Sequence, residues 1–310
     1  MKRCIAVFGP TASGKSGLAF ALAKAFHGVI ISADSMQIYK GMDIGTAKPT
    51  HEEMAEIPHK MIDICEPNDS FSVYDYKIRA EREIENAIQN GYLPILVGGT
   101  GMYFDALFYN TEFGEMEISP SVRANLQERV EKGETAALLQ ELFQVDPETA
   151  APLHEKDSKR IVRGLEVYYT TGKPLSQFKA ESKLNKSRFD FLKLYLVYEN
   201  RENLYRRINK RVEEMVESGL LRETKGLDEA GVFSGKTSSQ AIGYKEILPH
   251  LREGASLEDC ISLLKQKTRN YAKRQITWFK RYEDALPLIM DGEENPYKKA
   301  EGAVNQFLKG

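Results

Sequence analysis

The sequence predicts an α/β protein: a phosphate-loop-containing parallel sheet flanked by helices, with a smaller all-helical insertion domain. Short apolar runs alternate with amphipathic helical patterns, and a glycine-rich loop joins the first run to the first helix. One long central stretch contains helical patterns but no convincing strand. Strands that alternate with helices are typical of a parallel sheet covered on both faces. We therefore expect the first part of the core at 1–114, a helical insertion at 115–185, and the second part of the core at 186–310, with a basic C-terminal helix.

The individual elements follow from hydrophobic periodicity and from glycines that end helices. Apolar runs predict strands at 3–8, 28–32, 93–97 and 191–198. Helical patterns occupy 15–26, 74–90, 201–218 and 256–282 in the core, and 121–132, 134–144 and 157–170 in the insertion. Ser256 and Asp259 are a candidate capping pair for the last long helix.

Composition excludes several classes of protein. With 42% hydrophobic and 28% charged residues, the 310-residue chain can bury a core, so disorder is not expected. Lys+Arg 43 against Asp+Glu 45 excludes a globally basic nucleic-acid binder but allows a local basic face. The three cysteines are far apart and the histidines lack metal spacing, so we expect reduced, buried thiols in a cytoplasmic protein. No apolar run approaches the roughly 18 residues of a membrane span, and the N-terminus lacks a signal-peptide pattern.

The most specific local motif is a phosphate-binding loop between the first strand and the first helix. Its eight residues match GxxxxGK[ST] in full: Gly9, Pro10, Thr11, Ala12, Ser13, Gly14, Lys15 and Ser16. Glycines let successive amide N–H groups surround an anion, and the helix N-terminus adds positive potential. Lys15 can contact the terminal phosphate, and the Ser16 hydroxyl can bind Mg²⁺. The loop therefore predicts a diphosphate or triphosphate ligand, without identifying the molecule that carries it.

The acid nearest to the end of a strand is Asp34. Strand 93–97 is followed by Gly98-Gly99 instead of an acid, unlike the usual arrangement in nucleotide-hydrolysing switches. Ligands of such sheets bind beyond the carboxyl ends of the strands, so Asp34, Thr100 and the phosphate loop should converge on one crevice. Asp34 then has three interpretations: a Mg²⁺ ligand, a catalytic base, or a turn or capping residue.

Two basic clusters are candidates for RNA binding. One occupies the C-terminal helix and includes Lys265, Lys267, Arg269, Lys273, Arg274, Lys280 and Arg281. The other, in the insertion, comprises Lys156, Lys159, Arg160 and Arg163. Simple solvation of a helix face is the alternative explanation for each cluster.

Beyond these features, the chain resembles the bacterial tRNA dimethylallyltransferase family, also called tRNA isopentenyltransferases. The resemblance covers nearly the whole chain through the following motifs: GPTASGKS (9–16), SADSMQIYKGMDIGTAKP (32–49), PHKMID (58–63), FSVYDY (71–76), GGTGMY (98–103), DSKRIVRGLEVY (157–168), TGKPLSQ (171–177), QAIGYKE (240–246) and TRNYAKRQITWF (268–279). The loop alone is shared with many phosphate binders, whereas the combination of these motifs is selective.

The resemblance implies transfer of a dimethylallyl group from dimethylallyl diphosphate to the exocyclic amine of an adenosine. That adenosine lies 3′-adjacent to the anticodon in tRNAs that read codons beginning with U. The loop then holds the donor diphosphate with Mg²⁺, and Asp34, Thr11 and Arg207 are the implied catalytic residues, with Arg206 as the alternative to Arg207. The implied partners are a tRNA anticodon stem-loop and the prenyl diphosphate, with no membrane, and the family expectation is a monomer.

The implied tRNA-binding residues form a longer set. Asp34 is the general base on the amine, Ser35, Met36 and Gln37 line the flipped base, and other candidates lie in the insertion and the later helices. The full set is Asp34, Ser35, Met36, Gln37, Thr100, Arg123, Ser158, Lys159, Arg160, Ile161, Val162, Gln240, Lys273 and Arg274.

This chain departs from the family pattern at three places. Lys60 stands where a second histidine is usual, Glu155-Lys156 precedes Asp157 where Pro-Asn is common, and Gly164 replaces a common alanine. None of these positions belongs to the phosphate loop, and none is Asp34.

Three other functions compete with this interpretation. A small-molecule kinase would bind ATP in the loop and use Asp34 to activate a hydroxyl. A prenyltransferase acting on free adenine nucleotides would need neither the basic helix nor the insertion. A non-catalytic RNA-binding module would account for the basic faces but not for an intact phosphate loop.

Overall fold

A computed structural model describes residues 2–109, 119–184, 187–234 and 238–310, and they form two compact units. The first comprises Met1–Ser72, Tyr76–Phe104 and Phe189–Gly310, and the second Val73–Asp75 and Asp105–Arg188. The limits expected at 114/115 and 185/186 lie outside the described residues. The second unit already begins at Asp105, earlier than the expected residue 115.

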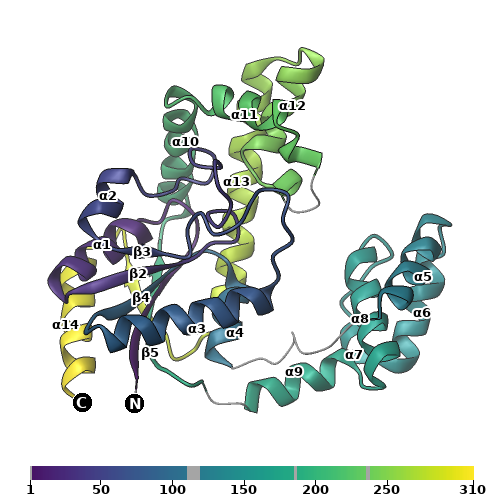
Figure 1. Ribbon diagram of the computed structural model, residues 1–310, viewed down its shortest axis with the longest axis horizontal. Helices are drawn as coiled ribbons and strands as arrows, with labels where there is room; N and C mark the ends of the chain where they lie inside the picture. The colour runs from purple at the N-terminus through teal and green to yellow at the C-terminus, as the bar shows by residue number, and fades with distance from the viewer. Residues whose placement is uncertain (1, 110–118, 185–186, 235–237) are drawn as a thin grey trace. The chain divides into compact units, whose positions relative to one another are not determined.

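The first unit contains a six-stranded, fully parallel sheet in the order β3-β2-β4-β1-β5-β6 (Figure 1). The strands are β1 (Arg3–Phe8), β2 (Gly28–Ala33), β3 (His59–Lys60), β4 (Leu93–Gly98), β5 (Asp190–Val197) and β6 (Leu286–Ile289). The four predicted strands are confirmed, within one residue at each end. Prediction missed β3 and β6 because they contain only 2 and 4 residues and give no readable period.

Alternating side chains of β1 enter two different cores, as expected for a sheet that is covered on both faces. Ile5 and Val7 pack in a cluster with α1 (Lys15–Ala25) and α14 (Pro296–Lys309). Phe8 points to the opposite face, where its ring centroid lies 5.3 Å from that of Phe104 in α4 (Gly101–Phe108) and 5.0 Å from that of Phe279. This packing fixes the end of β1, from which the phosphate loop begins.

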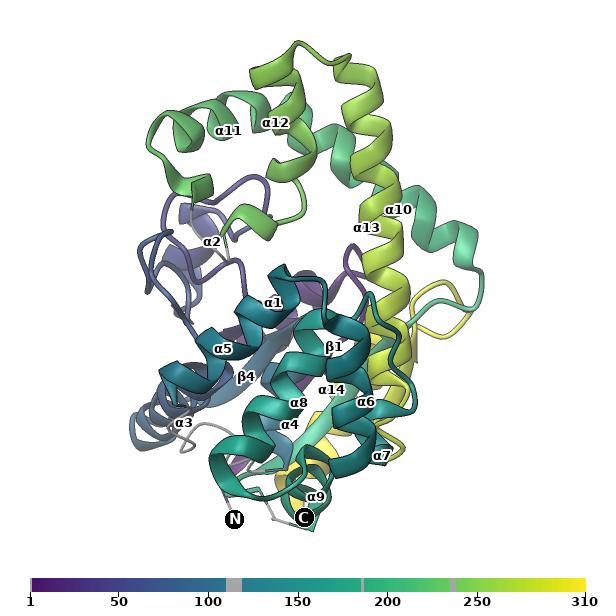
Figure 2. The same cartoon turned by 90° about the vertical axis from the view of Figure 1, so that its right-hand side faces the viewer.

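The remaining helices of the first unit build a lobe beside the sheet. Helices α10 (Arg201–Glu217) and α13 (Leu257–Phe279) pack together, and α13 connects the sheet with α11 (Leu220–Glu229) and α12 (Tyr244–Glu253) (Figures 1 and 2). The 3-10 turns Val232–Ser234 and Ser238–Gln240 lie between α11 and α12. The expected cap is confirmed, because the Ser256 hydroxyl accepts a hydrogen bond from the Asp259 amide at 3.4 Å. Helices α2 (His51–Glu56) and α3 (Val73–Gln89) complete the path between β2 and β4.

The second unit is helical throughout its described residues. It contains α5 (Pro120–Glu131), α6 (Thr135–Val145), α7 (Pro147–Ala150), α8 (Ser158–Thr171) and α9 (Leu175–Leu184) around its own core of Leu126, Leu138, Leu142, Ile161 and Leu165. Gly164 has a packing reason to be a glycine. A Cβ added there would lie 2.7 Å from Leu142 Cδ1, so the common alanine would require Leu142 to shift.

The cysteines meet the expectation from composition. Cys4, Cys65 and Cys260 are all buried. Among the described residues, no helix combines the length and apolar character needed to cross a membrane.

Candidate active site

The phosphate loop has a backbone that only glycine accommodates at two positions. Gly9 follows β1 with φ 156°, and a Cβ there would lie 2.8 Å from the Leu196 carbonyl oxygen. Gly14 precedes α1 with φ 95°, in the left-handed region. The loop therefore turns sharply from the strand into the helix, as its sequence predicts, and Pro10, Thr11, Ala12 and Ser13 form the bend between the two glycines.

Side chains from two distant helices hold this loop in shape. The Thr11 amide donates to Gln275 Oε1 at 2.8 Å, and Gln275 Nε2 donates in turn to the Gly99 carbonyl at 2.9 Å. Arg207 Nε donates to the Ala12 carbonyl at 2.9 Å. The Thr11 N–H is thereby occupied within the protein, so its hydroxyl is the group that remains for a ligand.

Lys15 is half-buried at the start of α1, and its ammonium donates to the Pro10 carbonyl at 2.7 Å. Loss of solvent and the neighbouring charge of Arg211 together lower the pKa of Lys15 to about 7, although the charge of Asp34 acts in the opposite direction. Two cations held this close attract an anionic ligand strongly, because the ligand relieves their mutual repulsion.

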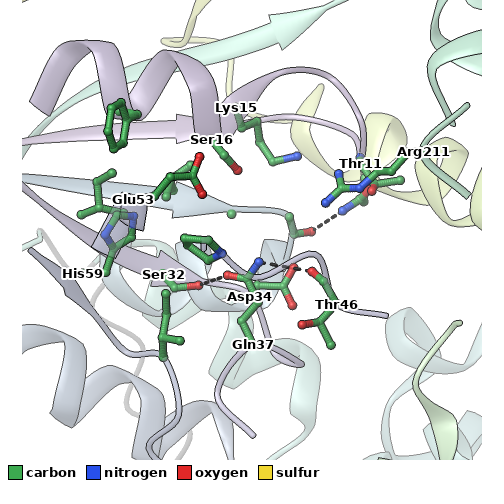
Figure 3. Close-up of a pocket in the computed structure, with 18 of the residues that line it drawn as sticks. Thr11, Lys15, Ser16, Ser32, Asp34, Gln37, Thr46, Glu53, His59 and Arg211 are labelled. Carbon is green, nitrogen blue, oxygen red and sulfur yellow. Dashed lines mark hydrogen bonds between the residues drawn. The ribbon is translucent and has the colours of Figure 1, made fainter. Parts of the chain in front are cut away.

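A single pocket joins the phosphate loop to the end of β2 (Figure 3). Ile30, Ser32 and Asp34 line it from alternate positions of β2 and the residue that follows it, as the period of a strand requires. Ser16 and Phe20 contribute from one face of α1. The loop and Asp34 thus line one pocket, as expected, whereas Thr100, which was expected in the same crevice, is not one of its lining residues and instead contacts Ser35.

Asp34 belongs to a turn as well as to the pocket. Its Oδ1 accepts a hydrogen bond from the Met36 amide at 2.9 Å, which is the geometry of an Asx turn. The amide of Ser35, the residue after Asp34, donates to the Thr100 hydroxyl at 2.9 Å. Thr100 Oγ1 also lies 3.3 Å from Ser35 Oγ. Thr100 thus braces the turn that presents the Asp34 carboxylate.

The side chain of Gln37 is bonded within the protein on both sides of its amide. Oε1 accepts from the Ser32 hydroxyl at 2.9 Å, and Nε2 donates to the carbonyls of Thr46 and Ala47 at 3.3 and 3.1 Å. Both amide hydrogens are therefore occupied, which leaves the second lone pair of Oε1 for a ligand. Gln37 forms a fixed part of the pocket wall.

The structure separates the two arginines that the sequence left as alternatives. Both side chains are exposed, but Arg207 contacts the phosphate loop, as described above, whereas Arg206 donates to Asn203 Oδ1 at 2.5 Å. The geometry therefore favours Arg207 as the arginine at the loop.

Sequence reasoning missed Arg211 and Tyr271, which both line the pocket. Burial lowers the pKa of Arg211, although the nearby Asp34 charge raises it. Burial raises the pKa of Tyr271, and its hydrogen bonds with Thr100 and Gln275 oppose that shift. Helical spacing was the available signal, because Arg211 is four residues after Arg207 and Gln275 is four residues after Tyr271.

Glu53 and His59 also line the pocket, near the β3 edge of the sheet. The His59 ring Nδ1 lies 2.7 Å from the Ile57 carbonyl oxygen, and burial lowers the pKa of the imidazole. A neutral ring that donates through Nδ1 presents Nε2 as an acceptor. Of the five histidines, His59, which belongs to the PHKMID motif, is the one that lines this pocket.

The described side chains of this pocket provide too few ligands for Mg²⁺ by themselves, so the ion would also need oxygens of a bound phosphate compound. Among the described residues there is no group of three or more His, Cys, Asp or Glu side chains that could hold a metal ion. Mg²⁺ characteristically takes one or two protein oxygens together with substrate phosphates and water. The Ser16 hydroxyl, beside Lys15 in the pocket, provides such an oxygen.

The basic residues of α13 divide into two groups. Lys265 pairs with Glu213 at 2.5 Å and Arg269 donates to Asn209 at 2.7 Å, so both serve the contact with α10. The exposed members on the helix are Lys267, Lys273 and Arg274. The sequence also placed Lys280 and Arg281 in this helix, and both are exposed just beyond its last residue, Phe279. Gln240 is exposed in the second 3-10 turn and does not line the pocket.

The expected tRNA contacts of the helical unit differ in exposure. The side chain of Ile161 is fully buried in the unit's core and Val162 packs against that core, so these two residues do not present exposed side chains, and contact of the segment 158–162 with tRNA stays a prediction. Ser158, Lys159 and Arg160 lie in the first turn of α8, where Lys159 and Arg160 are exposed. Arg123 is exposed and pairs through two nitrogens with the buried Glu166, which also binds Arg163.

A GxxxxGK[ST] loop between a strand and a helix of a parallel α/β sheet, with an acid beyond the next strand, is typical of the P-loop class of phosphate-binding proteins. The chain belongs to the IPP transferase family, whose family model matches residues 37–282; a second model, described as isopentenyl transferase, matches residues 2–68.

Relatives and solved structures agree with this assignment. A tRNA dimethylallyltransferase of Caldanaerobacter subterraneus subsp. tengcongensis is 45% identical over 99% of this chain and 97% of its own length. The crystal structure of a tRNA isopentenylpyrophosphate transferase from Staphylococcus epidermidis is 41% identical, covers 99% of both chains and has a TM-score of 0.71. A eukaryotic dimethylallyltransferase acting on tRNA is 32% identical over 100% of this chain and 80% of its own, with a TM-score of 0.84.

Proposed function

We propose that this protein transfers the dimethylallyl group of dimethylallyl diphosphate to the exocyclic amine of an adenosine in tRNA, and releases diphosphate. The acceptor is the adenosine 3′-adjacent to the anticodon in tRNAs that read codons beginning with U. The observation that carries the proposal is the single pocket that joins the phosphate loop to Asp34. Tight similarity to enzymes named tRNA dimethylallyltransferase supports tRNA as the acceptor.

One side of the pocket binds the leaving group. Lys15 and Arg211 line this side, and Arg207 contacts the loop at the Ala12 carbonyl without lining the pocket. In this proposal the loop amides and these three cations neutralise the charge that grows on the diphosphate as its bond to the allylic carbon breaks. The Ser16 hydroxyl, with the Thr11 hydroxyl nearby, would hold Mg²⁺ against the diphosphate oxygens. Bound Mg²⁺ would supply further neutralisation of that charge.

The other side of the pocket activates the amine. The lone pair of an adenine amine is delocalised into the ring, so the amine is a weak nucleophile. Asp34 accepts its proton while the new nitrogen–carbon bond forms, which typically contributes about 10²–10⁴-fold. The Asx turn and Thr100 keep the carboxylate in place. No covalent enzyme intermediate is required.

RNA binding compensates for extruding the base. Flipping a nucleotide costs a few kcal/mol and costs least in a loop, which favours an anticodon loop as substrate. The exposed cations of α13 and of the first turn of α8 are the phosphate contacts in this proposal. We further propose that the enzyme acts as a cytoplasmic monomer.

The decisive experiment supplies Mg²⁺ and dimethylallyl diphosphate with either an anticodon stem-loop or adenosine monophosphate. Prenylated product on the stem-loop alone is expected. Product on the mononucleotide would favour a free-nucleotide prenyltransferase. Phosphorylation by ATP would favour a kinase, and stem-loop binding without any product would favour a non-catalytic RNA-binding module.

A further inference from the structure

The segment 41–48 forms part of the pocket wall, although it contributes no charged group to the proposed chemistry. Thr46 is the residue of this segment that lines the pocket. Lys48 ties the segment to its surroundings: its ammonium donates to the Tyr39 carbonyl at 2.6 Å, to Asp43 at 2.7 Å and to Asp63 at 2.5 Å. The Lys48 side chain is 4% exposed, and its three donors are all used.

A second and more distant clamp holds the same segment from α11. The carboxylate of Glu223 accepts hydrogen bonds from the consecutive amides of Asp43, Ile44 and Gly45, at 3.1, 2.8 and 3.0 Å. The Tyr244 hydroxyl donates to the same carboxylate at 2.7 Å. Consecutive amides that converge on one anion form a concave nest, and bonds to an ionised acceptor are stronger than neutral ones.

Tyr244 also fixes the segment by contact. A Cβ added to Gly45 would lie 2.4 Å from Tyr244 Cζ, so the peptide backbone packs directly on the phenol ring. Tyr244 is fully buried. The clamp therefore combines one carboxylate and one aromatic ring from α11 and α12.

The clamped segment in turn holds Gln37. The two carbonyls that accept from the Gln37 amide belong to Thr46 and Ala47, directly after the clamped amides. Ala47 has φ 49°, and Asp63, whose amide donates to the Gln37 carbonyl, has φ 53°. Non-glycine residues in the left-handed region persist only where their surroundings impose that conformation, and such strain concentrates at functional sites.

We infer that Glu223 is a positioning residue for the acceptor side of the pocket. It acts on Gln37 and Thr46 through residues 43–47 of the segment 41–48. The inference rests on the proposed function, because it assigns Gln37 to the side on which the adenosine binds. The phosphate loop does not depend on this clamp, since Gln275 and Arg207 hold it separately. Loss of Glu223 therefore impairs use of the RNA and spares binding of diphosphate.

The test uses Glu223→Ala, Glu223→Gln and Tyr244→Phe, with Glu229→Ala as the matched control on α11, where Glu229 is exposed and pairs with Lys225 at 3.8 Å. Each variant is assayed for kcat and for KM of an anticodon stem-loop, and for the Kd of inorganic diphosphate. Small misplacements at an active site can cost about 10²-fold, so we expect at least about a tenfold loss in kcat/KM for the stem-loop in Glu223→Ala. The Kd of diphosphate should stay within about twofold, because its anchors do not change.

The graded variants separate positioning from folding. Glu223→Gln keeps one carbonyl acceptor, so its kcat/KM for the stem-loop should lie between those of wild type and Glu223→Ala. Tyr244→Phe should lose less kcat/KM than Glu223→Ala. Hydrogen exchange at the amides of 43–45 should accelerate in Glu223→Gln, which tests the clamp without activity. Wild-type kinetics in Glu223→Ala, or equal losses of stem-loop use and diphosphate binding, would overturn the inference. A wild-type protein that binds diphosphate but prenylates no RNA would contradict the proposed function itself.

Discussion

The two sides of the pocket are built in different ways. The phosphate side centres on one run of eight residues, Gly9 to Ser16, whose backbone shapes the anion site, and Arg211 of α10 adds charge to it. The acceptor side is assembled from β2, segment 43–47, Thr100 and α13, and it depends on side-chain hydrogen bonds between them. A site for a common group such as diphosphate can be encoded locally, whereas a site for one particular base requires several distant segments.

The two sides also differ in charge. Lys15 and Arg211 bring positive charge to the phosphate side, and Asp34 contributes the carboxylate on the acceptor side. Lys15, Arg211 and Asp34 line the same pocket, so the two sides lie close enough to act on one reaction.

The largest expected effect comes from Asp34→Asn, which breaks the acceptor side alone. The variant keeps an oxygen that can accept from the Met36 amide but loses the proton acceptor. Transfer should fall by about 10²–10⁴-fold in single-turnover assays. Stem-loop binding should stay within a few-fold of wild type. Asp259→Asn, an exposed acid in the first turn of α13, is the control and should behave as wild type. Loss of RNA binding without loss of the chemical step would give Asp34 a different role.

Arg211→Met tests the phosphate side. Removal of a positioned donor to a developing anion typically costs about 10²–10³-fold, and we expect a loss of that order in kcat/KM for dimethylallyl diphosphate. Lys210→Met is the matched control, because Lys210 is exposed on the same helix and pairs with Glu214. An unchanged kcat/KM for dimethylallyl diphosphate in Arg211→Met would show that this arginine does not contribute to the diphosphate site.

Some of the residues in these predictions could be identified from the sequence, and others could not. The phosphate loop, Asp34 and the four longer strands were predictable because each is encoded by neighbouring residues. Arg211, Tyr271 and Gln275 were not, since they reach the pocket only through the packing of α10 and α13 against the sheet. Burial of Ile161 was equally hidden, because its motif gives residue types without showing which face of α8 meets the core.

A pH dependence should report on the phosphate side. Lys15 has a pKa of about 7 in the unliganded protein, and an anionic donor binds the charged form. Below pH 7 Lys15 is already protonated. Above pH 7 Lys15 must take up a proton when dimethylallyl diphosphate binds, so the affinity for this substrate should fall by up to about tenfold per pH unit. Lys15→Arg, which stays charged, should remove this fall when the Kd of the donor is measured from pH 6 to 9. If the affinity still falls with rising pH in Lys15→Arg, the cause is titration of the ligand and not of Lys15.

The smallest effect concerns the RNA surface of α13. Lys273→Ala should weaken stem-loop binding a few-fold and reduce the salt dependence of binding by about one charge, because Lys273 is exposed. Lys265→Ala is the comparison, since Lys265 is paired with Glu213 and should leave the salt slope unchanged. Equal slopes for wild type and Lys273→Ala would reduce this face to a solvated surface.

The central claim is that the loop holds a prenyl diphosphate while Asp34 receives the proton of an adenosine amine. It is tested most directly by counting products in one reaction that contains labelled dimethylallyl diphosphate, ATP, Mg²⁺ and an anticodon stem-loop. The claim predicts one diphosphate released for each stem-loop prenylated, at a rate that does not change when ATP is omitted. Consumption of ATP with the stem-loop left unprenylated would contradict it.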